Sequence, residues 1–166
     1  RPFVITRSAY SGAQRYTSSW TGDNVATWEH LWVANVQMQR MSISGMGFTG
    51  SDIGGFAEQP SAELYARWIQ LGVFHPFCRT HSSGHHGEQE PWSFGDEVID
   101  ITRKFVELRY QLLPYLYTMF WQYVNDGVPM LKPLVYFDQD DTQTHYRTDE
   151  FIFGNQILVC PILEPN

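Results

Sequence analysis

Two aspartates, an arginine and a histidine are the residues of this chain that best suit chemistry. Asp23 lies in the stretch SWTGDN, three residues after Trp20, between a glycine and an asparagine. An indole ring beside a carboxyl group can strip water from it and raise its pKa toward the range useful for proton donation. Asp23 is therefore a candidate general acid/base, with a turn or a helix cap as the competing interpretation.

A second carboxylate, Asp52, lies among glycines in the stretch GSDIGGF. Gly50, Gly54 and Gly55 allow another group to come close to the backbone, as a tight turn or a ligand site requires. An ionised Asp52 could accept hydrogen bonds from two neighbouring hydroxyls of a sugar. A plain turn is the alternative.

Arg7 and His81 each follow a short apolar segment. An unpaired guanidinium at the end of a buried strand would be costly, so Arg7 is expected to pair with a carboxylate. His81 precedes His85 and His86, but no pair of Cys or His lies elsewhere at a zinc-binding spacing. No metal ion is therefore expected, and His81 is interpreted as a ligand contact.

Aromatic residues flank these candidates. Trp20 and Phe56 could form the walls of a sugar pocket through their apolar ring faces. Tryptophans at helical spacing are instead expected in the core. These are Trp28, Trp32, Trp68 and Trp121.

Alternating strands and helices are predicted to position the candidate residues. Strands are expected at residues 2–6, about 16–20, 43–49 and 73–79. Helices are expected after a cap at Asp23, Asn24 or Thr27, from Ser61 to Gly72, and from a cap at Asp96 to Pro114, with a second piece at 115–124. Arg7, Asp23, Asp52 and His81 would each close one of four successive strands.

The alternation repeats about every 25 to 30 residues, the rhythm of βα units with a parallel sheet. Residues 1–127 are predicted to be an incomplete α/β domain, about half of a (β/α)8 barrel, in which strand ends carry the active site. Residues 128–166 have only β patterning and are predicted to begin an all-β domain. Half a barrel leaves open sheet edges, so the chain is expected to need the remainder of its own polypeptide as a partner.

Composition excludes several classes of protein. Aromatic residues make up 16% and charged residues 17% of the 166 residues, which argues for a buried core and against disorder. The formal charge is −7 and no basic cluster is present, so no nucleic-acid partner is expected. No apolar run could span a bilayer, and no signal peptide opens the chain. Cys78 and Cys160 are expected as buried free thiols, with a disulfide as the alternative.

Several long motifs together resemble glycoside hydrolase family 31, the α-glucosidase/α-xylosidase family. They are RPFVITRS, WTGDN, GSDIGGF, WIQLGVFHPFCRTH and LLPYLYTMFW, and EPWSFG is most similar to the α-glucosidase II-like branch. The resemblance covers almost the whole chain. It implies an internal fragment of a retaining glycosidase, with the second half of the catalytic barrel followed by the start of the proximal β-sandwich. The compartment (cytoplasm, periplasm or secretory lumen) stays open.

The resemblance also implies roles for residues. Asp23 looks like the general acid/base, and Arg7 is similar to the arginine that contacts the sugar at subsite −1 and the nucleophile. Asp52 and His81 look like hydroxyl-binding residues of that subsite. The aromatic pair Trp20 and Phe56 falls where the family has pocket walls.

The implied activity is that of an exo-acting α-glucosidase, which releases terminal non-reducing α-linked glucose from oligosaccharides by double displacement without a cofactor. The family's nucleophile is an aspartate in a Trp-x-Asp-Met-Asn-type motif before RPFVITRS, and these 166 residues lack that motif. Retaining hydrolysis needs both carboxylates. A same-family α-xylosidase, transglucosidase, sulfoquinovosidase or α-glucan lyase, or a non-catalytic sugar-binding protein, remain alternatives.

Overall fold

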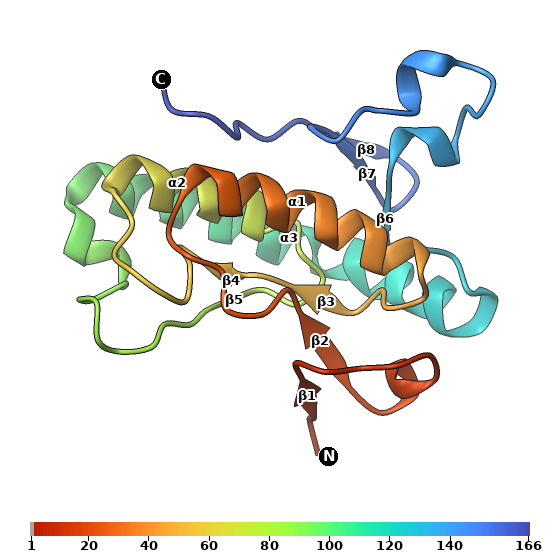
Figure 1. The fold of residues 1–166 in the computed structure, drawn as a ribbon, viewed down its shortest axis with the longest axis horizontal. Coiled ribbons are helices and arrows are strands. Elements are labelled where there is room, and N and C mark those ends of the chain that lie inside the picture. Colours follow the sequence, from red (N-terminus) through yellow and green to blue (C-terminus); the bar gives the residue numbers. More distant parts are fainter. Residues whose placement is uncertain (1) are drawn as a thin grey trace.

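The computed structural model describes residues 2–166, which form three long helices and eight short strands (Figure 1). The helices are α1 (Trp28–Ile43), α2 (Ala62–Gly72) and α3 (Asp96–Asp126). The first five strands are β1 (Ile5–Thr6), β2 (Ser18–Trp20), β3 (Thr49–Gly50), β4 (Asp52–Ile53) and β5 (Arg79–Thr80). The last three are β6 (Leu131–Lys132), β7 (Phe151–Phe153) and β8 (Ile157–Val159).

The first five strands pair only in parallel, as the βα rhythm predicts. One sheet has the order β1-β2-β3, and β4 pairs with β5. A hydrogen bond of 3.0 Å from the Phe77 amide to the Thr49 carbonyl joins the two sheets. Helix α1 connects β2 to β3, and α2 connects β4 to β5, so parallel neighbours are reached by helical crossovers.

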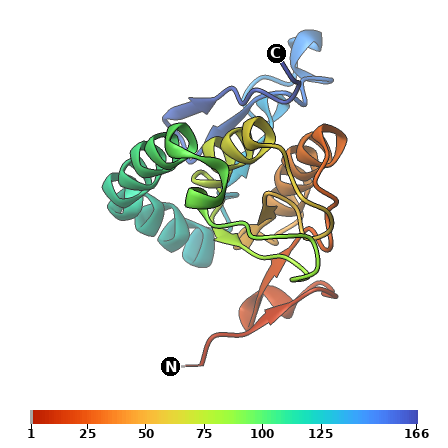
Figure 2. The same cartoon turned by 90° about the vertical axis from the view of Figure 1, so that its left-hand side faces the viewer.

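The remaining strands form an antiparallel sheet, β6-β7-β8, which confirms the change to β-only structure after α3. This sheet lies on the side of the helices opposite β1 and β2 (Figures 1 and 2). Hydrogen bonds tie it to the helices: the Ser42 hydroxyl accepts from the Leu131 amide, and the Tyr115 hydroxyl donates to the Phe153 carbonyl.

Capping residues explain where the first two helices begin. The Thr27 hydroxyl accepts from the amide of His30 at the start of α1, and the Ser61 hydroxyl accepts from that of Leu64 at the start of α2. Of the three caps proposed for α1, Thr27 is the one used. Asp23 is therefore not a helix cap.

Helix α3 corrects two expectations. Its N-cap is Gly95 rather than Asp96, and it runs through Pro114 without a break. Leu112 and Tyr115, on either side of the proline, both pack against the core. The Thr118 hydroxyl donates to the Pro114 carbonyl.

Three strand expectations are wrong or too long. Helix α1 extends to Ile43, so residues 43–48 are not a strand, and residues 73–78 form turns that lead into β5. The run 2–6 was expected to be a buried strand, but Phe3 and Val4 are exposed and only β1 pairs. Within residues 2–166, no strand covers the outer edge of β1.

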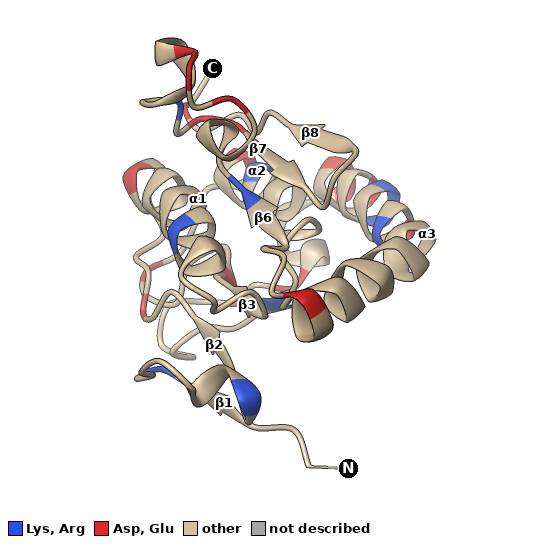
Figure 3. Cartoon of the chain, turned by 90° about the vertical axis from the view of Figure 1, so that its right-hand side faces the viewer, with Lys and Arg blue, Asp and Glu red and all other residues tan. Residues whose placement is uncertain are grey.

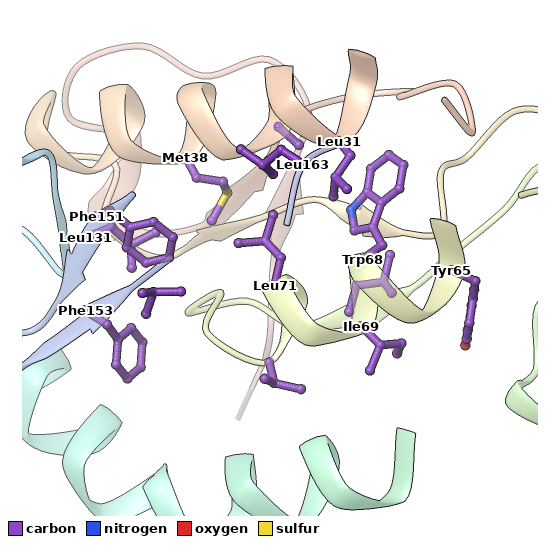
Figure 4. Close-up of a cluster of buried hydrophobic side chains, with 14 of the residues drawn as sticks. Leu31, Met38, Tyr65, Trp68, Ile69, Leu71, Leu131, Phe151, Phe153 and Leu163 are labelled. Carbon is purple, nitrogen blue, oxygen red and sulfur yellow. The ribbon is translucent and has the colours of Figure 1, made fainter. Parts of the chain in front are cut away.

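The core lies between α1, α2, α3 and the C-terminal sheet (Figure 4). Trp68 and Tyr65 of α2 are its largest side chains, with Phe151 and Phe153 contributed by β7. Trp68 is in the core as predicted, whereas the expectation is wrong for Trp32 and Trp121, which are 43% and 57% exposed.

Charged residues are spread over several elements, as the view in Figure 3 illustrates. Both cysteines are free thiols. Cys78 is half-buried, and burial raises the pKa of its thiol. Cys160 is exposed, which corrects the expectation that it is buried.

Candidate active site

The four candidate residues follow one another along the carboxyl ends of the parallel strands. Arg7 directly follows β1, Asp23 lies in the loop after β2, and His81 directly follows β5. Asp52 begins β4, two residues beyond the end of β3. Because carboxyl ends of parallel strands lie at the same edge of a sheet, the four side chains belong to one face of the structure.

Arg7 pairs with Asp23. Its Nη1 atom donates to Oδ2 of the carboxylate at 2.8 Å, so the predicted pairing of Arg7 is confirmed. The Asp23 side chain is 43% exposed, which contradicts the expectation that Trp20 strips it of water. An ion pair this exposed contributes about 0–1 kcal/mol to stability. Its main effect here is to orient the carboxylate.

The loop that carries Asp23 is fastened to the glycine-rich loop after β4. Asn24 is buried, and its carbonyl accepts hydrogen bonds from the amides of Phe56, at 2.7 Å, and Ala57, at 3.1 Å. Gly22 adopts a positive φ of 86°, which lets the chain turn before Asp23. The backbone therefore holds the Asp23 loop against the segment around Phe56.

Asp52 is fully buried and is held by Arg79 of the neighbouring strand. Nε of Arg79 donates to Oδ1 of Asp52 at 2.9 Å, and Nη2 lies 2.9 Å from the same oxygen. Burial raises the pKa of Asp52 to about 6, against the lowering effect of Arg79 and His81. Oδ2, the other carboxylate oxygen, is buried and has no hydrogen-bond partner within residues 2–166. Buried carboxylate oxygens normally have a partner, so Oδ2 is left with an unmet capacity to accept a hydrogen bond.

A polar network lies behind Asp52. The Trp68 indole donates to the Ser51 hydroxyl at 3.0 Å, and that hydroxyl lies 3.4 Å from Nδ1 of His75. Burial lowers the pKa of His75 to about 3, so the ring is neutral at ordinary pH. These contacts fix the backbone next to Asp52 without adding charge to the site.

Aromatic rings flank the charged groups. The ring centroids of Phe56 and His81 are 5.3 Å apart, and His81 is exposed while Phe56 is half-buried. The Arg79 guanidinium lies 5.0 Å from the centroid of the Trp20 ring. Each of the two expected wall residues therefore lies beside a polar candidate. The indole N–H of Trp20 is buried without an acceptor in the part of the chain that is described.

The glycines around Asp52 have a different role from the one first considered. A Cβ at Gly50 would lie 1.8 Å from the Phe77 carbonyl oxygen, and a Cβ at Gly55 would lie 2.7 Å from the Ala26 backbone. The chain itself makes the close approaches that were expected of a ligand. These glycines allow the strands and loops of the site to pack together.

Arg79 is the functional candidate that sequence reasoning missed. Parallel pairing of β4 with β5 brings Asp52 and Arg79 into register. That register depends on the turns between α2 and β5, which the sequence pattern assigned to a longer strand.

Cavities lie on both sides of these residues. One of about 300 Å³ is lined by the loop after β5, including His81, Gln89 and Glu90. One of about 370 Å³ lies beside Arg7 and Trp20. A hollow of about 670 Å³ between the start of α1 and the C-terminal segment is larger but contains none of the candidate residues.

Within residues 2–166, no three His, Cys, Asp or Glu side chains are grouped so that they could hold a metal ion. No helix in that range has the length and apolar character needed to cross a bilayer.

Parallel βα units with polar residues at the strand ends, followed by an antiparallel sheet, define an α/β protein whose candidate site lies at the carboxyl edge of its strands. The chain belongs to glycoside hydrolase family 31. Residues 1–119 match the family 31 TIM-barrel domain, and residues 127–166 match the family 31 C-terminal domain.

Relatives support the α-glucosidase II-like branch. The chain is 43% identical over its full length to "Alpha-glucosidase 2" of Bacillus thermoamyloliquefaciens, of which it covers 21%. It is 41% identical over 99% of its length to "Neutral alpha-glucosidase C" of Mus musculus, of which it covers 18%. The chain thus spans about a fifth of these relatives.

Solved structures agree with the sequence relatives. The whole chain superposes on 18% of a glucosidase II alpha subunit described as Glc1Man2-bound, with a TM-score of 0.96 and 36% identity. It also superposes, over 99% of its length, on 21% of a dextranase of Flavobacterium johnsoniae complexed with glucose, with a TM-score of 0.91 and 35% identity.

Proposed function

We propose that this chain provides the acid/base half of the active site of a retaining, exo-acting α-glucosidase. The ion pair between Arg7 and Asp23 carries the proposal, because it holds an accessible carboxylate at the edge where the other sugar-binding candidates lie. Membership of family 31 and the α-glucosidase names of its relatives support the substrate class, an α-linked glucoside.

In this mechanism, Asp23 donates a proton to the glycosidic oxygen as the bond to the anomeric carbon breaks. It then removes a proton from water, which attacks the glycosyl–enzyme ester. Arg7 orients the carboxylate throughout. The solvent access of Asp23 suits a group that must reach both the leaving oxygen and water.

The glucose ring is held by the residues beside Asp23. Asp52 accepts hydrogen bonds from ring hydroxyls through Oδ2, and His81 contacts another hydroxyl. Trp20 and Phe56 pack on the apolar faces of the sugar. No cofactor takes part.

We further propose that the nucleophile is an aspartate outside this chain, on a strand that precedes Arg7 in the full-length protein. The chain would then form the second half of the barrel, with a boundary near Gly127 and the proximal β-sandwich beginning at residue 128. Gly127 directly follows α3 and adopts the left-handed conformation that ends many helices. The end of this helix supports a boundary there.

The test replaces Asp23 by Asn in the full-length protein. Hydrolysis of maltose should fall by about 10²–10⁴-fold, the usual contribution of general acid–base catalysis. Glycosyl transfer from a substrate with a good leaving group needs little protonation, so its first step should be spared. Burst and steady-state kinetics separate the two steps.

Asp100→Asn is the matched control, because Asp100 is an exposed aspartate paired with Arg103 on α3. It should retain full activity. Unchanged maltose hydrolysis in Asp23→Asn would contradict the proposal. Product analysis in ¹⁸O-labelled water distinguishes hydrolysis from transfer or elimination.

A further inference from the structure

Arg79 makes a one-sided contact with Asp52. Because β4 and β5 pair in parallel with Asp52 opposite Arg79, the two side chains meet across the strand pair. Nε and Nη2 of Arg79 both lie 2.9 Å from Oδ1. Neither contact involves Oδ2, which keeps its capacity to accept a hydrogen bond.

The guanidinium is itself held in place. It lies 5.0 Å from the centroid of the Trp20 ring and 5.3 Å from that of Phe77. Its side chain is 25% exposed. A planar cation held by two aromatic rings has little freedom to rotate, so the orientation of the Asp52 carboxylate is fixed as well.

The charge on Asp52 depends on its neighbours. Burial disfavours the ionised form, and the negative charge of Asp23, after β2, adds to that effect. His81 and Arg79, both on the β5 side, oppose it. Arg79 is the one group with a direct hydrogen bond to the carboxylate among the residues described.

We propose that Arg79 is a positioning residue of the glucosidase, which keeps Asp52 ionised and turns its second oxygen toward a sugar hydroxyl. The inference rests on the proposed function. Arg79 acts through Asp52, so its loss should weaken substrate binding in the same way as loss of the Asp52 charge.

The experiment uses the full-length protein with Arg79→Gln, Arg79→Lys, Asp52→Asn and the double variant Arg79→Gln/Asp52→Asn. Arg103→Gln is the control, since Arg103 forms an exposed ion pair on α3. KM and kcat for maltose are measured, together with kcat/KM across pH and the melting temperature.

Arg79→Gln is expected to raise KM about tenfold or more, the loss of about one charge-assisted hydrogen bond. The acid limb of kcat/KM should move up by about one to three pH units, because the positive charge next to Asp52 is gone. Arg79→Lys keeps the charge and should restore the acid limb, though not the full affinity. The double variant should be no worse than Asp52→Asn alone.

Melting temperatures test the inference without activity. The difference in melting temperature between Asp52→Asn and the wild type should stop widening only well above pH 6, because Asp52, with a pKa of about 6, is half ionised at pH 6 and fully ionised only at higher pH. In the Arg79→Gln background the corresponding gap should continue to widen at higher pH. A purely structural Arg79 would lower the melting temperature without moving either pH profile.

Different results overturn different statements. An inactive wild-type enzyme overturns the proposed function, while the melting-temperature gaps still decide the role of Arg79. An active wild type with an unchanged KM and acid limb in Arg79→Gln overturns the inference about Arg79. The inference about Arg79 is also overturned if the losses of substrate affinity caused by Arg79→Gln and Asp52→Asn add up in the double variant.

Discussion

Asp52 is a carboxylate whose position favours function over stability. It is fully buried, one of its oxygens is held by Arg79, and burial raises its pKa from 3.8 to about 6. A group with a raised folded-state pKa binds protons more tightly in the folded state. The folded state therefore loses stability, relative to the unfolded chain, as the pH rises from about 4 through about 6.

Asp52→Asn should consequently stabilise the full-length protein at pH 7.5, by an amount on the order of 3 kcal/mol. At pH 4 the effect should be small, because Asp52 is then protonated in the folded state and only about half ionised in the unfolded chain. Thermal melting of both proteins across pH 4–8 measures the difference. A stabilisation of equal size at pH 4 and pH 7.5 would show that the charge is not its cause.

Residue types and order were enough to identify the strand-end candidates and the pairing of Arg7 with a carboxylate. They were not enough to find the Asp52–Arg79 contact, which depends on strand register. Nor did the order of residues reveal that Asp23 is open to solvent. The indole of Trp20 lies beside Arg79 instead, and sequence proximity to Asp23 did not predict that.

Among the elements, β3 and the segment before β5 are so close that glycine is required at residue 50. A Cβ there would lie 1.8 Å from the backbone oxygen of Phe77. Gly50→Ala must therefore separate the two sheets, and a loss of about 3 kcal/mol or more is expected. Because Asp52 and Arg79 lie on either side of this contact, activity should fall as well.

Gly84→Ala is the comparison. Gly84 has a positive φ of 77° but no atom within 4 Å of the added Cβ, so the loss should be about 1 kcal/mol. Chemical denaturation of the full-length variants measures both. Equal effects would mean that the close approach at residue 50 relaxes readily.

A second contact between elements positions β5. Arg109 of α3 donates to the carbonyls of Val73, His75 and Pro76, at 2.6, 2.7 and 3.0 Å. Arg109→Met keeps the length of the side chain but leaves these carbonyls without a donor. A loss of about 2–4 kcal/mol is expected.

Arg103→Met on the same helix breaks only an exposed pair and should change stability by less than about 1 kcal/mol. Denaturant titrations give the free energy of unfolding of the two variants for comparison. An effect of Arg109→Met as small as that of the control would mean that water replaces the guanidinium.

Helix starts were predictable at this scale, because the caps at Thr27 and Ser61 depend on local sequence. The continuity of α3 through Pro114 was not. It depends on packing against the core, which includes residues of α2 and β7. Strand lengths were predicted wrongly as well. A strand extends only as far as a neighbouring strand pairs with it, and its own sequence does not contain that information.

At the scale of the whole molecule, a broad apolar surface is left uncovered on α3. Its exposed residues recur in steps of three and four, so they form one stripe. The stripe consists of Val106, Tyr110, Leu113, Tyr117, Trp121 and Val124. Together with the uncovered edge of β1, it is the kind of surface that promotes association.

Residues 1–166 expressed alone should therefore self-associate. Replacing Tyr117 and Trp121 by Gln and Lys should raise the monomer fraction, since both rings are more than half exposed and neither is part of the core. Analytical ultracentrifugation gives the distribution. The same changes in Tyr65 and Trp68, which are buried, should unfold the chain instead.

The register between β4 and β5 has a consequence for how this family can change length. Side chains alternate faces along a strand, so a deletion of one residue in the turns at 73–78 would place Thr80 opposite Asp52. The guanidinium would move away from the carboxylate, and His81 would leave its place beside Phe56. Selection should therefore remove insertions and deletions between α2 and β5, whereas family members should tolerate them in the loop that begins after His81.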